Sequence, residues 1–180
     1  MLGLGGGGLA HSLSHYYPQM TIQLVELRQA VIDVAYEWFN LPQSSQLHVT
    51  QGDAMAYMAN AKCGSTDIIF SDLYQAEAMS ECQAQQDFVK HCYRALSEQG
   101  CLVINYHAMP DNDAPVMHGI RKLFSEIVLC DVANGNRIVF CCKKTVLFSC
   151  DSLTERAEVL VQQVEMPLMY YYHQLQKFSI

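Results

Sequence analysis

MLGLGGGG (residues 1–8) opens the chain with short apolar residues that lead into a run of glycines. Residues 9–17 are compatible with a helix, so this beginning predicts a strand, a tight turn and a helix. Gly3, Gly5 and Gly7 give a G-x-G-x-G spacing at the turn. Because glycine lacks a Cβ atom, the backbone there can approach a ligand closely and direct amides at it beside a helix N-terminus. A tight turn without a ligand is the alternative interpretation.

Short β-prone runs alternate with helical patterns after this turn. The runs expected to form strands are 20–25, 47–50, 67–71 and 101–106. The apolar spacing over 88–96 predicts a helix, and Gly100 is expected to cap its C-terminus. Strands separated by helices pair in parallel through right-handed crossovers, since a hairpin cannot join parallel neighbours.

Two further β-prone runs break this alternation near the end of the chain. Residues 127–132 and 137–142 flank a loop with Asn134-Gly135, a pair that tolerates the positive φ angles of a hairpin turn. The predicted fold class is therefore α/β: a doubly wound, Rossmann-like methyltransferase fold whose mostly parallel sheet has an antiparallel C-terminal hairpin edge. A dinucleotide-binding fold with six parallel strands would not end in this way.

The chain length of 180 residues fits one ordinary domain. We assign residues 1–150 to a nucleoside-binding α/β domain and residues 151–180 to a helical tail that packs on this domain or on a partner. A central strand usually has about five residues, whereas only Met1 and Leu2 precede Gly3. We therefore expect a truncated first strand and a longer parent chain.

Composition argues against several classes of function. The apolar fraction of 51% and the charged fraction of 16% are typical of a compact fold. A net charge of -7 without a basic run argues against nucleic-acid binding and favours a cationic substrate. No apolar run approaches the roughly 18 residues of a membrane span, so we expect no membrane association. The eight cysteines form no C-x-x-C pair and lie mostly in apolar runs, which predicts reduced thiols and a cytoplasmic location.

Three acidic residues follow successive predicted strands, at the edge where open α/β sheets hold their ligands. Glu26 stands at about the distance beyond the glycines at which such folds place an acid on the ribose hydroxyls; a carboxylate at a helix start is the alternative. Asp53 follows Gly52 and can face an adenine edge, or it is an N-cap. Asp72 is the best candidate for a general base, with a turn-capping role as the alternative.

Other polar residues carry weaker signals. Asn105, Tyr106 and His107 reach the same edge from the next strand, but the sequence assigns them no definite role. His11 and His15 are four residues apart on a predicted helix without a third ligand, so we predict no metal site. Motifs for a phosphate-binding loop and for a nucleophile elbow are absent from the sequence.

With these residues assembled, the chain resembles the spermidine synthase-like family of polyamine aminopropyltransferases, a branch of the class I S-adenosylmethionine-dependent methyltransferase fold. The resemblance covers roughly residues 1–143. Its motifs are Leu2-Gly3-Leu4-Gly5-Gly6-Gly7-Gly8, Val25-Glu26-Leu27, Gly52-Asp53-Ala54, Asp67-Ile68-Ile69-Phe70-Ser71-Asp72 and Gly100-Cys101-Leu102-Val103.

The resemblance implies a donor substrate, S-adenosylmethionine or decarboxylated S-adenosylmethionine, and no metal. The residues that it implies around the donor are Gly3, Gly5, Gly7, Glu26, Leu27, Asp53, Ala54 and Asp72. Within this set, Glu26 would bind the ribose, Asp53 would lie at the adenine, and Asp72 would deprotonate the attacking amine. Tyr74 and Gln75 would contact that amine substrate, and a homodimer is a further expectation.

Two positions depart from the family pattern. Gly6 stands where the family usually has an Asp that holds the donor's amino group, and Gln75 stands where another substrate-binding Asp is usual. Aminopropyl transfer to a polyamine is the first hypothesis. Methyl transfer from S-adenosylmethionine to an unknown acceptor is the alternative that these two positions favour. A non-catalytic nucleoside-binding or dimerisation module is a different alternative, and nicotinamide-dependent oxidoreductase chemistry has the least support.

Overall fold

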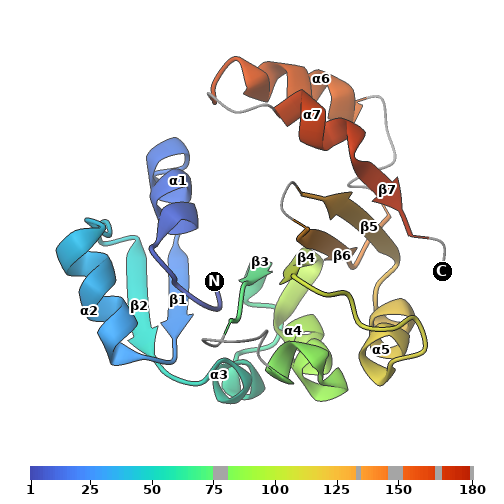
Figure 1. The fold of residues 1–180 in the computed structure, drawn as a ribbon, viewed down its shortest axis with the longest axis horizontal. Coiled ribbons are helices and arrows are strands. Elements are labelled where there is room, and N and C mark those ends of the chain that lie inside the picture. Colours follow the sequence, from blue (N-terminus) through green and yellow to red (C-terminus); the bar gives the residue numbers. More distant parts are fainter. Residues whose placement is uncertain (75–80, 133–134, 146–151, 165–167, 179–180) are drawn as a thin grey trace.

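The structure is a computed structural model that describes residues 1–74, 81–132, 135–145, 152–164 and 168–178 (Figure 1). Helices and strands alternate through most of its length. In chain order they are α1 (Gly8–Tyr16), β1 (Ile22–Glu26), α2 (Gln29–Trp38), β2 (Leu47–Gln51), α3 (Ala54–Asn60), β3 (Thr66–Ser71), the short 3-10 helix η1 (Glu81–Ala84), α4 (Gln86–Ala95), β4 (Leu96–Tyr106), α5 (Pro115–Leu123), β5 (Glu126–Asp131), β6 (Arg137–Cys142), α6 (Ser152–Val161), α7 (Leu168–His173) and β7 (Leu175–Lys177).

Leu2 joins the two parallel parts of the sheet. β1 pairs in parallel with β2, and β3 pairs in parallel with β4. Between them, Leu2 makes parallel bridges to Val25 of β1 and to Ser71 of β3. The Leu2 amide donates to the Phe70 carbonyl at 2.8 Å, and the Gly3 amide donates to the Val25 carbonyl at 2.9 Å. Leu2 therefore occupies the place of the predicted first strand, between the second and the fourth.

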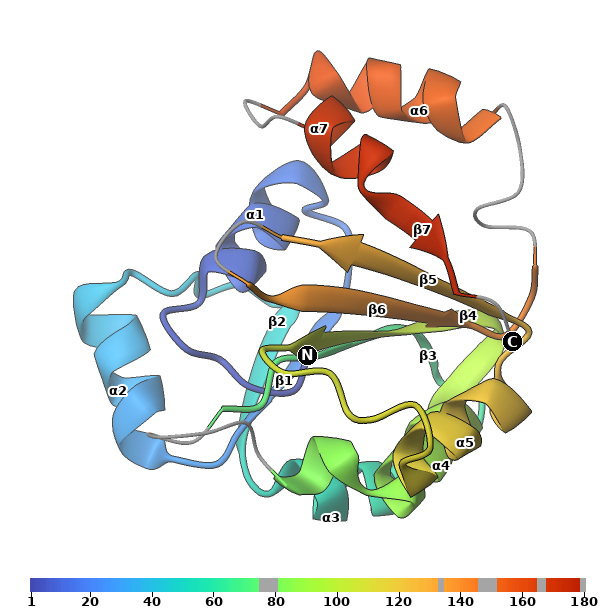
Figure 2. The same cartoon turned by 45° about the vertical axis from the view of Figure 1, so that its right-hand side comes forward.

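The antiparallel part of the sheet confirms the predicted hairpin and adds a strand to it. β6 lies between β4 and β5 and pairs antiparallel with both, so the return strand is inside the sheet (Figure 2). Gly135 has a φ of 90°, as a hairpin turn requires; Asn134 lies outside the described residues. The edge is formed by β7, which pairs with β5 and belongs to the segment expected to be helical.

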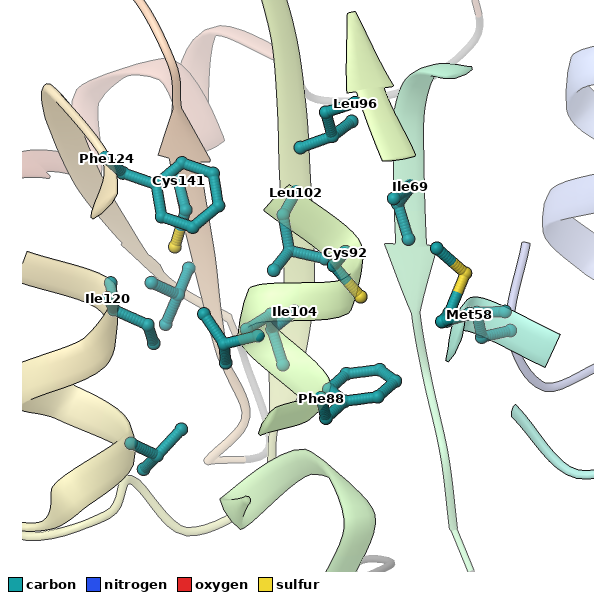
Figure 3. Close-up of a cluster of buried hydrophobic side chains, with 14 of the residues drawn as sticks. Met58, Ile69, Phe88, Cys92, Leu96, Leu102, Ile104, Ile120, Phe124 and Cys141 are labelled. Atoms are coloured by element: carbon teal, nitrogen blue, oxygen red, sulfur yellow. The ribbon is translucent and has the colours of Figure 1, made fainter. Parts of the chain in front are cut away.

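Two hydrophobic clusters hold the helices against the sheet. One joins the central strands to α3, α4 and α5, with Phe88, Cys92 and Ile120 completely buried (Figure 3). The other joins α1 and α2 to β1 and β2, around Ala10 and Leu24. Since helices pack on both sides of a mostly parallel sheet, the predicted doubly wound fold is confirmed.

The prediction that Gly100 caps a helix is wrong. α4 ends at Ala95, and Gly100 lies inside β4. A Cβ atom at Gly100 would lie 2.9 Å from the Leu96 Cβ and 3.1 Å from the Asp67 carbonyl oxygen. This glycine is therefore needed for the close approach of two strands, which a sequence pattern does not distinguish from a helix end.

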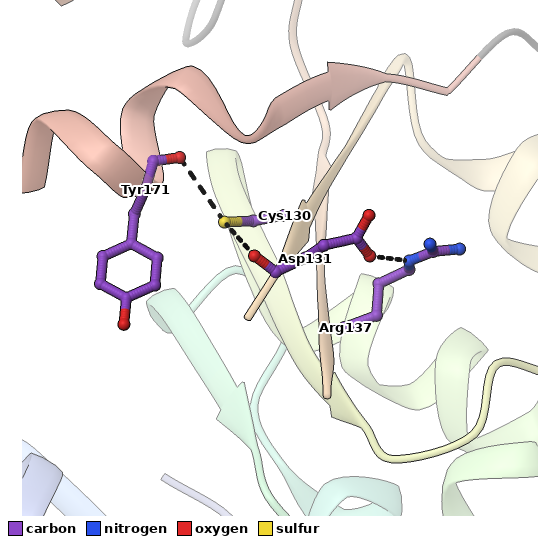
Figure 4. A network of polar contacts seen from close by, with 4 residues as sticks. All are labelled: Cys130, Asp131, Arg137 and Tyr171. Atoms are coloured by element: carbon purple, nitrogen blue, oxygen red, sulfur yellow. Dashed lines mark hydrogen bonds and ion pairs between the residues drawn. The ribbon is translucent and has the colours of Figure 1, made fainter. Parts of the chain in front are cut away.

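The C-terminal segment contacts the sheet through its edge. α6 and α7 lie beyond β5 and β7 in both overall views (Figures 1 and 2). The Cys130 thiol donates to the Tyr171 carbonyl at 3.7 Å, which links β5 to α7 (Figure 4). Thr154 and Tyr172 share a hydroxyl hydrogen bond of 2.7 Å between α6 and α7. No helix in the described parts of the chain has the length and apolarity to cross a membrane.

Candidate functional site

A cavity of about 340 Å³ opens at the carboxyl ends of the parallel strands. It lies where Leu2 leads into the glycine loop, between the ends of β1, β2 and β3. Its lining residues are Gly3, Leu4, Gly5, Val25, Glu26, Leu27, Arg28, Gly52, Asp53, Ala54, Asp72, Leu73, Tyr74 and Cys82. The structure thus brings together most of the residues that the sequence indicated. Of the residues implied around the donor and the amine, Gly7 is buried away from the cavity and Gln75 lies outside the described residues. The more weakly indicated Asn105, Tyr106 and His107 do not line the cavity either.

The glycine loop needs its glycines for different reasons. Gly3 has a φ of 88°, and a Cβ atom there would lie 2.2 Å from the Asp72 carbonyl oxygen. Gly5 has a φ of 52°, and a Cβ atom at this position would have no neighbour within 4 Å, so the Gly5 backbone faces open space. Gly7, with a φ of 80°, is the N-cap residue of α1, and its Cβ would meet Leu41 at 2.8 Å. Gly3 permits the loop to pass beside Asp72, Gly5 exposes backbone to the cavity, and Gly7 shapes the helix start.

Glu26 ties the glycine loop to the end of β1. Its Oε2 accepts from the Leu4 amide and its Oε1 accepts from the Arg28 amide, both at 3.0 Å. The residue is only 7% exposed and lines the cavity. Each carboxylate oxygen has two acceptor sites, so these two amides leave capacity for the hydroxyls of a ribose. The structural and ligand-binding roles of Glu26 are compatible.

Asp53 is an N-cap, as the alternative interpretation predicted. Its Oδ1 accepts from the Ala56 amide at 2.8 Å at the start of α3. It also lines the cavity together with Ala54 and with Leu27, a residue that is 53% exposed. A planar ring that packs on this exposed leucine would remove its apolar surface from water, which favours binding. The glycine cradle, the carboxylates and this apolar wall fit a nucleoside.

Asp72 lines the same cavity and comes immediately after β3. Its Oδ1 accepts from the Asn105 side-chain amide at 2.9 Å. Nearby, the Tyr74 hydroxyl donates to the Asn105 carbonyl at 3.4 Å. Burial, and then the charge of Asp72, raise the pKa of the Tyr74 phenol. Tyr74 is therefore a neutral hydrogen-bonding group at physiological pH.

Two lining residues with polar side chains, Cys82 and Arg28, were not indicated by the sequence. Cys82 reaches the cavity from η1, and burial, followed by the charge of Asp53, raises the pKa of its thiol to about 11. Arg28 follows Glu26 and is the one cation among the described lining residues. No sequence signal indicated Cys82, because the turn that carries it has no motif.

Gln83, on the same turn, connects it to the neighbouring strands by hydrogen bonds and was also not indicated by the sequence. It is completely buried, and its side-chain oxygen accepts from the Ser71 hydroxyl at 2.6 Å and from the Leu73 amide at 3.3 Å. The Tyr106 hydroxyl donates to the Gln83 carbonyl at 3.2 Å. Because a buried polar group is costly without partners, these bonds hold η1 to the ends of β3 and β4. Gln83 thereby sets the position of Cys82 at the cavity.

Comparison with known proteins gives a family match over most of the chain. A family model described as "Spermine/spermidine synthase domain" matches residues 1–134. The chain is 30% identical over 138 residues to the "Probable polyamine aminopropyl transferase" of Bifidobacterium longum, across 77% of this chain and 29% of that protein. It is 27% identical over 172 residues to the polyamine aminopropyltransferase of Vibrio vulnificus, across 92% of this chain and 56% of that protein.

Solved structures show the same fold. Human methyltransferase-like protein 13 in complex with SAH has a TM-score of 0.78 at 23% identity, across 92% of this chain and 81% of that one. A probable spermidine synthase from Corynebacterium glutamicum has a TM-score of 0.74 at 20% identity, across 89% of this chain and 61% of that one. The chain spans between 29% and 56% of the length of the two curated relatives above.

Proposed function

The chain belongs to the spermine/spermidine synthase domain family, and on that premise we propose that it transfers an aminopropyl group from decarboxylated S-adenosylmethionine to an amine, with Asp72 as the base. The observation that carries the proposal is the convergence of the glycine loop, Glu26, Asp53 and Asp72 on one cavity. A nucleoside donor and a proton acceptor need to share a site for this reaction, and the cavity offers groups suited to both.

The donor half of the cavity has the chemistry that an adenosyl group requires. Glu26 has acceptor capacity for ribose hydroxyls beyond its two backbone amides. Leu27 and Ala54 provide apolar wall for the purine, and Asp53 offers an acceptor beside it. The open backbone at Gly5 leaves room for the rest of the donor.

The acceptor half is suited to a cationic amine. An alkyl amine has a pKa near 10, so it reaches the site mostly protonated and must lose a proton before it attacks. Asp72 attracts the ammonium group and takes that proton, while Tyr74 offers a neutral hydroxyl beside it. When bound, the donor supplies an electrophilic carbon on a sulfonium, whose carbon–sulfur bond breaks as the amine nitrogen bonds to the carbon, leaving a neutral thioether. General-base catalysis of this kind contributes roughly 100- to 10,000-fold in rate.

Methyl transfer from S-adenosylmethionine to an amine is the second candidate, and the composition of the loop favours it. Gly6 brings no carboxylate to the loop, whereas an acid there would hold the amino group of the donor. The chain also has relatives among methyltransferases: it is 24% identical over 159 residues to the "eEF1A lysine and N-terminal methyltransferase" of Danio rerio, across 81% of this chain and 23% of that protein. Both reactions need the same nucleoside contacts.

Product analysis separates the two candidates. The protein is incubated with each donor and with a panel of linear diamines and triamines, and mass spectrometry identifies an added aminopropyl or methyl group. We expect aminopropyl products from the decarboxylated donor. Methyl products alone would support the second candidate, and binding without any product would support a non-catalytic module.

Two variants then test the base. Asp72→Asn is expected to lower kcat roughly 100- to 10,000-fold while nucleoside affinity is kept. Asp113→Asn, an exposed aspartate away from the cavity, is the matched control and should retain activity. Full activity of the Asp72 variant would exclude the aspartate as the base.

A further inference from the structure

A chain of side-chain hydrogen bonds leads away from Asp72 to the turn of the hairpin. The Asn105 amide nitrogen donates to Asp72 Oδ1 at 2.9 Å, and the Asn136 amide nitrogen donates to Asn105 Oδ1 at 3.1 Å. His107 Nδ1 lies 3.0 Å from Asn136 Oδ1. Asn105 is near the end of β4, His107 follows that strand, and Asn136 immediately precedes β6. The connected side chains thus come from three separate segments.

The carboxylate determines the direction of every bond in this chain. An ionised carboxylate only accepts, so Asn105 must turn its NH₂ group toward Asp72 and its oxygen toward Asn136. Asn136 must then donate to that oxygen and present its own oxygen to His107. Because this oxygen only accepts, His107 Nδ1 must donate a hydrogen bond to it. A neutral His107 is therefore the Nδ1–H tautomer.

The hairpin keeps Asn136 in its place. β4 and β6 are antiparallel, so the end of β4 lies beside the start of β6, with Tyr106 opposite Arg137. Arg137 forms an ion pair with Asp131 across the hairpin (Figure 4). The Val132 amide donates to the Asn136 carbonyl at 2.9 Å, which closes the turn. Asn136 is thus held by the backbone as well as by its side chain.

Asn105 is equally well fixed. Its backbone pairs with Ile138 in the sheet, and its carbonyl oxygen accepts from Tyr74 and from the Gln83 side chain, both at 3.4 Å. Its side chain is bonded at both ends, as described above. An amide with so little freedom sets the orientation of the carboxylate to which it donates. Asp72 Oδ2 remains outside this network.

We propose that Asn105 and Asn136 are positioning residues for Asp72. They hold Oδ1 from the side of β4 and so orient Oδ2 for the proton of the amine. This inference rests on the proposed function, since it gives the network a purpose only if Asp72 is the base. It also gives the antiparallel hairpin a part in the site, because Asn136 connects the hairpin turn to the carboxylate.

The first test needs neither donor nor amine. Nitrogen-15 NMR of the histidine ring reports which nitrogen of His107 carries the proton, after assignment with His107→Gln. We expect the Nδ1–H tautomer in the wild-type protein at a pH where the ring is neutral. We expect Asp72→Asn to reduce its population, because asparagine can donate as well as accept and no longer imposes a direction. An Nε2–H tautomer in the wild-type protein, or a tautomer unaffected by Asp72→Asn, would overturn the network.

The second test is kinetic and uses one isosteric change and one truncation. Asn136→Asp keeps the size of the side chain but removes the donor to Asn105, and Asn105→Ala removes the amide that contacts Asp72. We expect kcat to fall about 10- to 150-fold for Asn105→Ala, the size expected for one hydrogen bond to a charged group, and less for Asn136→Asp. The affinity for methylthioadenosine should stay unchanged for both. Asn60→Ala, an exposed change at the end of α3, is the control.

The outcomes are separable. A fall in kcat with unchanged nucleoside affinity and unchanged thermal stability supports positioning, whereas parallel losses of stability and binding would mean that Asn105 is merely structural and would overturn the proposal. Unchanged kcat in both variants would also overturn it. A protein that turns over no amine with either donor would contradict the proposed function, and the histidine tautomer alone would then decide whether the network orients Asp72.

Discussion

Glu26→Ala is the substitution whose effects are most directly defined by the structure. The wild-type carboxylate accepts from the amides of Leu4 and Arg28 at 3.0 Å each and lines the cavity. Alanine removes both acceptors and also the group proposed to bind the ribose. Glu26→Gln keeps the size but replaces one acceptor by a donor, so only one of the two amides keeps its partner.

The expected losses have two parts. Hydrogen bonds to a charged group contribute about 1.5–3 kcal/mol, so nucleoside affinity should fall roughly 10- to 150-fold in Glu26→Ala. Independently, the Leu4 amide loses its partner in a buried position, and such a loss costs about 1–3 kcal/mol of folding stability. Glu26→Gln should lie between the wild-type protein and the alanine variant in both respects.

Isothermal calorimetry with methylthioadenosine measures the first loss, and urea unfolding measures the second. Glu37→Ala, an exposed change on α2, is the matched control and should leave both values unchanged. If Glu26→Ala lost folding stability yet bound the nucleoside with wild-type affinity, Glu26 would serve only to hold the glycine loop. The ribose assignment would then have to be abandoned.

Two further predictions concern the cavity walls. Gly3→Ala should lower the free energy of unfolding by roughly 2–5 kcal/mol, because alanine is strained at a φ of 88° and its Cβ would lie 2.2 Å from the Asp72 carbonyl oxygen. Gly8→Ala, at a position with open space around it, is the control in urea unfolding. Equal stability of the two variants would contradict the steric argument. Cys82, with a thiol pKa of about 11, should be alkylated far more slowly by iodoacetamide at pH 8 than the exposed Cys63, since only about one thiol in a thousand is then ionised. The alkylation rate of Cys82 should increase as the pH rises toward 11, and mass spectrometry of the two peptides measures both rates. A Cys82 rate that does not change with pH would contradict the raised pKa.

Much of the fold is predictable because its signals are local. Short β-prone runs separated by helical patterns indicated the parallel strands, and Asn134-Gly135 indicated the hairpin. By contrast, β7 has three residues, Leu175–Lys177, too few for a period-two pattern. Its pairing with β5 is a long-range contact to which the local sequence gives no clue. Gly100 was misplaced for a similar reason, since its role depends on a neighbouring strand.

The same distinction between local signals and long-range contacts applies to the residues of the site. Glu26 is the last residue of β1, and Asp53 and Asp72 come shortly after β2 and β3. Their convergence at one sheet edge therefore follows from the topology. Gln83 and Cys82 reach the site through hydrogen bonds between segments, and no sequence period or motif records such bonds. The structure further shows Asp53 in its capping role, which the sequence offered only as one of two alternatives.

In the proposed donor site, a nucleoside binds between the glycine loop and the carboxylates, facing Asp72. A crystal structure of the protein with methylthioadenosine tests this directly. We expect ribose hydroxyls within hydrogen-bonding distance of Glu26, the purine between Leu27 and Ala54, and the sulfur atom toward Asp72. Nucleoside density elsewhere on the protein, or a ribose without contact to Glu26, would contradict it.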